Sequence, residues 1–114
     1  MKAWKVEDWC TPREMTLTDL PVPEPGQGQA LVRVHAAALN FFDVLMISGK
    51  YQVKPPLPFT PGCEMAGEVV AAGPGSVFRR GDRVCGQPGW GAFGEYVLVE
   101  NDRTDIVPDG VPMH

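Results

Sequence analysis

Apolar and polar residues alternate along much of this chain in short runs, a pattern that predicts β-strands rather than long helices. In residues 29–36 (QALVRVHA), Arg33 and His35 fall on one face of the expected strand and Val32 and Val34 on the other. The same reading predicts further strands at 2–6, 14–20, 65–72, 82–85 and 93–100, and a last short strand within 105–112 that runs into a linker near His114.

One segment carries helical signals instead. Asn40 is a suitable N-cap, Asp43 stands three residues later, and Gly49 is placed to end a helix. We therefore expect a short helix over 40–48, with Leu45 on the side formed by its apolar residues.

Glycine and proline divide the apolar runs. The 114 residues include 13 glycines and 12 prolines, mostly spread singly between the runs, which is typical of short strands joined by tight turns. Residues 54–61 hold four prolines and are expected to form a stiff loop. The chain is long enough for one domain, over 1–114, and the expected fold is mainly β: a closed or nearly closed β-barrel with one short helix.

Charge and composition exclude several partners. The formal net charge of −4 argues against nucleic acid or an anionic membrane surface, and no apolar run approaches the roughly 20 residues that span a bilayer. Residues 1–5 (MKAWK) are not followed by the apolar core of a signal peptide. Three widely spaced cysteines, Cys10, Cys63 and Cys85, indicate reduced thiols, so we expect a cytoplasmic protein.

Glycine-rich segments do not supply a dinucleotide site. No G-x-G-x-x-G follows a strand and opens a helix; the segments 73–75 and 89–91 are better explained as turns. A metal site at Cys63 and Glu64 is weakly supported, because no C-x-x-C or H-x-x-H spacing supplies further ligands. A buried thiol and a carboxylate that hold a loop are the favoured interpretation.

The sequence allows two interpretations for each of two polar side chains. Asn40 is a helix cap, a ligand contact, or both, because its amide offers a neutral donor and acceptor. Tyr51 follows the expected helix and is either an exposed ring or a hydroxyl that faces a pocket.

Five segments, taken in order, resemble the zinc-independent quinone oxidoreductase (zeta-crystallin-like) branch of the medium-chain dehydrogenase/reductase superfamily. They are 36–43 (AAALNFFD), 48–51 (SGKY), 61–69 (PGCEMAGEV), 81–84 (GDRV) and 91–96 (GAFGEY). The resemblance extends over essentially the whole chain and implies the GroES-like N-terminal part of a catalytic domain, without the Rossmann cofactor domain of the family.

The resemblance also implies a function. The full-length parent is expected to be an oxidoreductase that uses NADPH or NADH to reduce a quinone, an enone or an enoyl thioester, and to form a homo-oligomer. This chain alone is expected to be inactive and to bind no cofactor tightly, since its partner, the Rossmann domain, is missing.

Site residues follow by position from the same resemblance. Asn40 matches the family asparagine near the nicotinamide, and Tyr51 a tyrosine that approaches the substrate and is assigned to proton delivery in enoyl reductases. Leu45 stands where quinone reductases often have tyrosine, and Cys63 where relatives have a small hydroxyl or amide residue; both are assigned to the substrate pocket. Zinc-dependent relatives have cysteine and histidine at the positions of Asn40 and Cys63, so no metal is expected.

Two other functions remain as alternatives. The same barrel occurs in the co-chaperonin for which the fold is named, so a stand-alone binding or scaffold module is possible. A half of a zinc alcohol dehydrogenase with altered ligands is the other.

Overall fold

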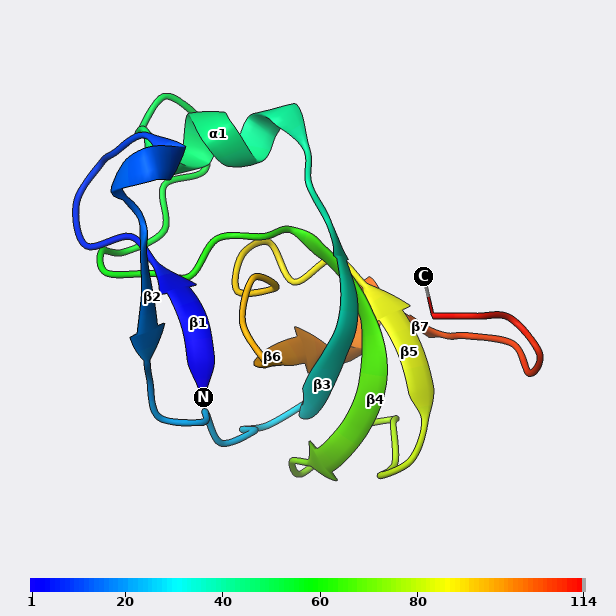
Figure 1. Cartoon of the computed structure of the whole chain (residues 1–114). Coiled ribbons are helices and arrows are strands. Elements are labelled where there is room, and N and C mark those ends of the chain that lie inside the picture. Colours follow the sequence, from blue (N-terminus) through cyan, green and yellow to red (C-terminus); the bar gives the residue numbers. More distant parts are fainter. Residues whose placement is uncertain (114) are drawn as a thin grey trace.

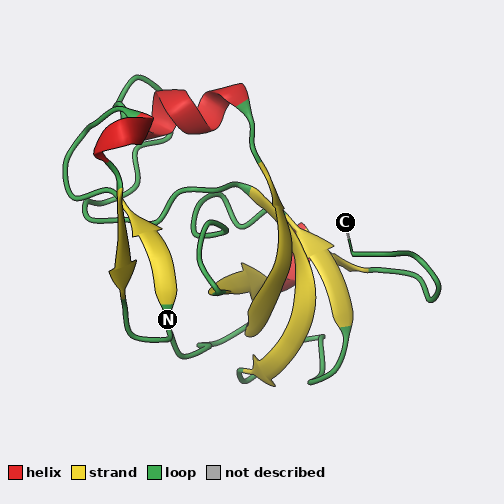
Figure 2. Cartoon of the chain, in the orientation of Figure 1, coloured by secondary structure: helices red, strands yellow, loops and turns green. Residues whose placement is uncertain are grey.

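The strands form two antiparallel sheets, one of two strands and one of five (Figure 1, Figure 2). The computed structural model describes residues 1–113, so His114, where the expected linker ends, lies outside the described residues. The elements, in chain order, are β1 (Lys2–Lys5), η1 (Pro12–Glu14), β2 (Thr16–Asp19), β3 (Gln29–Ala38), α1 (Phe41–Ile47), β4 (Glu64–Ala72), β5 (Arg83–Gly86), β6 (Tyr96–Glu100), η2 (Asn101–Arg103) and β7 (Thr104–Ile106).

The larger sheet is curled but does not close. Its strand order is β6-β3-β4-β5-β7, and its two edge strands do not pair with each other within residues 1–113. The prediction of a mainly β domain with one short α-helix is confirmed for residues 1–113, and the barrel is a half-barrel rather than a closed one. Figure 1 shows α1 at one end of it, toward which β1 points. We call this the helical end; β3 and β5 end there and β4 begins there.

The two sheets are joined by the segment that precedes β6. The Trp4 amide donates to the Phe93 carbonyl and the Glu95 amide to the Lys2 carbonyl, both at 3.0 Å. The regular strand expected over 93–100 therefore begins only at Tyr96, because residues 93 and 94 pair with β1. Glu95 bonds to both strands, since its carbonyl oxygen accepts from the Val34 amide of β3 at 2.9 Å.

Alternation along β3 places apolar side chains inside the half-barrel. Ala30 and Val32 are fully buried, whereas Arg33 and His35 are exposed, as the sequence pattern predicts. The two buried residues belong to the main core, which consists of Ala30, Val32, Met65, Val69, Phe78, Val84, Ala92, Val97 and Val99.

A second apolar cluster attaches α1 to the rest of the fold. Met46 and Ile47 are almost completely buried, and they pack with Val6 and Phe59, whose backbones bond to each other at 2.8 and 3.0 Å. Phe59 comes from the proline-rich loop 54–61, which contains no helix and no regular strand, as expected. Within the described residues, the helix is too short to cross a membrane.

One glycine allows β3 and β4 to come together at a bulge. The pairing register shifts between Val34 and Ala36, and a Cβ added to Gly67, which lies opposite, would come within 2.2 Å of the Arg33 carbonyl oxygen. No side chain fits at this position without displacing the backbone of β3.

We therefore expect Gly67→Ala to lower the free energy of unfolding by about 2–3 kcal/mol, measured by urea denaturation. Gly26→Ala is the matched control, since the added Cβ would meet only the end of the flexible Gln29 side chain, at 3.3 Å. Equal stability of the two variants would contradict this account of the strand pairing.

Candidate functional site

The start of α1 meets the start of β4 at the helical end. Asn40 is the N-cap residue, and its backbone N–H donates to the Asp43 carboxylate at 2.8 Å. The two residues form a capping box, in which the Asn40 side chain in turn accepts from the Asp43 backbone N–H. Nδ2 of the same amide donates to Oε2 of Glu64 at 3.4 Å. Asn40 therefore caps the helix, and the NH₂ of its amide is also directed across the junction toward β4.

Cys63 lies at the same junction and is buried. Its sulfur is 3.2 Å from Oδ1 of Asp43 and 2.9 Å from the carbonyl oxygen of Gly89. Gly62 places Cys63 there with a φ of 104°, and a Cβ added to it would come within 2.6 Å of the Phe93 ring. The thiol therefore connects α1, the start of β4 and the loop before β6.

A cavity of about 340 Å³ opens beside this junction. Tyr51 forms part of its wall, with its ring stacked on Phe42 at 5.6 Å between centroids and 23° between planes. The tyrosine hydroxyl makes no hydrogen bond to any of residues 1–113 and is free for a ligand. The cavity is lined by Phe42, Met46, Tyr51, Val53, Cys63, Glu64, Gln87, Gly89 and Arg103.

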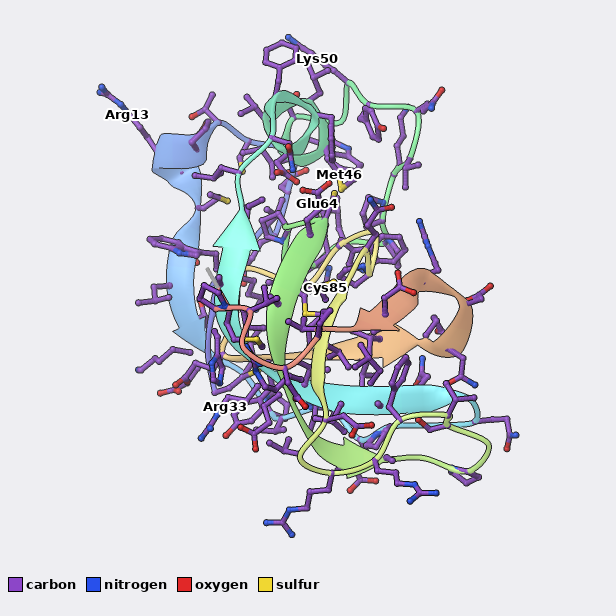
Figure 3. The ribbon with its side chains drawn as sticks, turned by 90° about the vertical axis from the view of Figure 1, so that its right-hand side faces the viewer. Arg13, Arg33, Met46, Lys50, Glu64 and Cys85 are labelled. Carbon is purple, nitrogen blue, oxygen red and sulfur yellow. The ribbon has the colours of Figure 1, made fainter. Side chains whose placement is uncertain are left out.

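A second, more open hollow of about 800 Å³ lies next to it. The ends of β3 and β5, the start of β4, and β7 surround it, and it shares Glu64, Gln87 and Arg103 with the smaller cavity. Figure 3 shows Met46 and Glu64 close together beneath α1, with Cys85 farther along the sheet. The three shared polar side chains form the boundary between the two spaces.

Three of the four site residues expected from the sequence gather here. Tyr51 and Cys63 line the smaller cavity, and Asn40 contacts Glu64 at its edge. Leu45 is half-buried on α1 and is not among the side chains that line this cavity. The roles assigned to these four residues remain predictions.

Sequence reasoning missed Gln87 and Arg103. Gln87 follows β5, and Arg103 ends the short helix η2 between β6 and β7. A backbone bond from the Gln87 amide to the Arg103 carbonyl at 3.0 Å brings them together. A polar residue in a loop carries no local signal that distinguishes a cavity wall from a solvated turn. Only the pairing of β5 with β7 places them here.

Burial and charge keep the thiol of the cavity protonated. Burial first, and then the hydrogen bond and the negative charge of Asp43, raise the pKa of Cys63 to about 12; Glu64 contributes to the increase and Arg103 opposes it. The site therefore presents a neutral thiol at ordinary pH, with Asp43, Glu64 and Arg103 as its nearby charged groups.

The donor set does not suit a metal. Within residues 1–113, no three His, Cys, Asp or Glu side chains are grouped so that they could hold an ion. Asp43, the carboxylate beside Cys63, already accepts from the Asn40 backbone and faces the protonated thiol. The other residue that faces Glu64, Asn40, is an amide.

The family model and the similar proteins all point to one group of oxidoreductases. The model of the alcohol dehydrogenase GroES-like domain matches residues 26–109. The chain is 37% identical over 112 residues to the quinone oxidoreductase of Rattus norvegicus, covering 96% of this chain and 34% of that protein. It is 43% identical over 93 residues to the trans-enoyl reductase FMN2 of Fusarium mangiferae, covering 81% and 24%.

Solved structures agree with the fold. The quinone oxidoreductase of Escherichia coli, solved in complex with NADPH, superposes on 99% of this chain with a TM-score of 0.91 and 27% identity. The match covers 35% of that chain. The present chain thus spans about a third, or less, of the length of these relatives.

We expect N-ethylmaleimide to label the exposed Cys85 readily at pH 8 and to leave Cys63 unmodified in the folded protein, measured by peptide mass spectrometry. The reagent attacks the thiolate, which forms at Cys63 only as the pH nears the pKa of about 12. Unfolding in urea is the control, because it removes the burial and the Asp43 contact. Equal labelling of both thiols in the folded chain would contradict the description of this site.

Proposed function

The chain belongs to the alcohol dehydrogenase GroES-like domain family, within the medium-chain dehydrogenase/reductase superfamily, and we propose that it is the substrate-side domain of an NAD(P)H-dependent, zinc-independent reductase. The acceptor is a quinone, an enone or an enoyl thioester. The observation that carries the proposal is the 340 Å³ cavity where Tyr51, Cys63 and Glu64 meet, with Asn40 at its edge.

The cavity has the size and lining for a single ring and its substituents. Apolar groups of Phe42, Met46 and Val53 form much of its wall, and polar groups stand on the side shared with the open hollow. A nicotinamide ring fits such a space, whereas a whole dinucleotide exceeds it. When bound, the nicotinamide supplies a hydride. The rest of the cofactor is left to a Rossmann domain outside this chain, and the whole protein is a homo-oligomer.

Asn40 is the residue that would hold the carboxamide end of the nicotinamide. One N–H of its amide is directed to Glu64, which fixes the orientation of the group. The oxygen of the amide faces the Asp43 backbone in the capping box. The second N–H remains for a ligand and can donate to the carbonyl oxygen of a primary carboxamide. A neutral group is suited to this place because it does not perturb the charge of the ring.

Tyr51 would serve the acceptor. Its stacking on Phe42 fixes the ring, so the hydroxyl is held at one place in the cavity wall. A hydroxyl at that place donates a hydrogen bond to the acceptor oxygen as negative charge develops there, and it holds a proton for delivery. No step passes through a metal, since the residues do not form a ligand set.

The surface around Asn40 supports a missing partner domain. Its two chain neighbours, Leu39 and Phe41, are 80% and 77% exposed and are the most exposed of the large apolar side chains described. Leu39 also borders an apolar groove with Trp4 and Leu17. A Rossmann domain that covers this face would bury these side chains and bring the nicotinamide to the cavity.

We expect a longer protein that contains this chain and a dinucleotide-binding domain to oxidise NADPH or NADH when given a quinone, an enone or an enoyl thioester. The 114-residue chain alone should show no turnover, because it holds only one end of the cofactor. The decrease in absorbance of the reduced nicotinamide measures the turnover of the longer protein and of the isolated chain. Sustained turnover by the isolated chain, or none by the longer protein with all three acceptor classes, would refute the proposed function.

In that longer protein, Tyr51→Phe should lower kcat for an enone by about 10²-fold through loss of the proton donor. Tyr96→Phe is the matched control. Tyr96 is half-buried on β6 and does not line the cavity, so the kcat of this variant should be unchanged. Unaltered turnover by the Tyr51 variant would remove this residue from the mechanism.

A further inference from the structure

A carboxylate is buried beneath the proposed nicotinamide contact without a basic partner. Asp43 is 3% exposed, and no Lys, Arg or His side chain of residues 1–113 forms an ion pair with it. Such a charge requires hydrogen-bond donors to remain stable in the interior. Two are present, the backbone N–H of Asn40 at 2.8 Å and the thiol of Cys63 at 3.2 Å.

Of these two donors, the thiol is the one that a side-chain substitution can remove. Cys63 is 8% exposed, and burial together with the Asp43 charge raises its pKa to about 12, so it keeps its proton over the ordinary pH range. The Gly89 carbonyl oxygen, 2.9 Å from the sulfur, is the other acceptor within reach of its one proton. Although Gly89 is nearer, we assign the proton to Asp43, because a charged acceptor forms the stronger hydrogen bond.

We propose that Cys63 is a positioning residue whose thiol, by donating to Asp43, fixes the start of α1 and the direction of the Asn40 amide. Oδ1 of Asp43 accepts from the thiol while Oδ2 accepts from the Asn40 backbone, so one carboxylate holds both segments. Asn40 then reaches Glu64, the residue that follows Cys63 in the chain. The proposal rests on the proposed function only in one respect, namely that the positioned Asn40 amide contacts a nicotinamide.

Serine and alanine separate hydrogen bonding from packing at this position. Cys63→Ser keeps a hydroxyl donor for Asp43, although it changes the size and polarity of the side chain. Cys63→Ala removes the donor and leaves one carboxylate oxygen without a partner. A purely structural role would make both variants alike, or make serine the worse one.

The test uses NMR on the 114-residue chain. Cys63→Ala should increase hydrogen exchange at the Asn40 backbone amide by about tenfold, because its acceptor Asp43 is no longer fixed. The side-chain NH₂ resonances of Asn40 should move as well. In Cys63→Ser, the exchange rate of the Asn40 amide and the positions of its side-chain resonances should both stay close to those of the unsubstituted chain.

Cys10→Ala is the matched control. Cys10 packs against the same apolar cluster as Cys63, but its thiol makes no hydrogen bond to residues 1–113. This variant should leave Asn40 unchanged. Unchanged exchange and resonances of Asn40 in Cys63→Ala, or a serine variant that behaves as alanine does, would overturn the proposal.

A measurement on the native Cys63 covers the case in which the alanine variant does not fold. In a Cys10→Ala/Cys85→Ala background, the only S–H stretching band in the Raman spectrum belongs to Cys63. The band should lie at lower frequency in the folded chain than in urea, because donation to a carboxylate weakens the S–H bond. Equal frequencies in the two states would overturn the proposal. Neither measurement needs a cofactor or an acceptor. A failure of the positioning role of Cys63 can therefore be distinguished from a failure of the proposed reductase function.

Discussion

A carboxylate buried without a basic partner is the constraint on which the arrangement of the helical end depends. Asp43 remains there because the Asn40 backbone and the Cys63 thiol both donate to it. Those bonds join the start of α1 to the start of β4, and the Gly89 carbonyl, from the loop before β6, lies 2.9 Å from the same sulfur. The cavity beside Tyr51 exists because these segments, distant in the sequence, meet at one buried group.

The curled sheet supplies the rigid support behind that junction. Its main core fills the inside of the half-barrel, and Gly67 lets β3 and β4 approach at their bulge. The strand ends at the helical end then carry Glu64, Gln87 and Arg103 to the boundary between the two hollows. A cavity walled on one side and open on the other is suited to a ligand that is shared with a second domain.

The sequence predicts most of the fold, because alternation and turn residues are local signals. It places α1 correctly, since Asn40 and Asp43 lie at its start. It places the start of β6 wrongly, because nothing in the pattern of residues 93 and 94 shows that they pair with β1 and not with β3. The bond between Asp43 and Cys63 joins residues 20 positions apart, and neither side chain indicates its partner in the sequence.

The central claim is that this chain holds the acceptor while a nicotinamide delivers hydride to it. The most direct measurement follows deuterium in a longer protein that contains this chain and a cofactor domain. It supplies an enone and a nicotinamide cofactor deuterated at the transferring carbon. The account predicts one cofactor-derived deuterium at the β-carbon of the product and a solvent-derived proton at the α-carbon. A reduced product without cofactor-derived deuterium would contradict it.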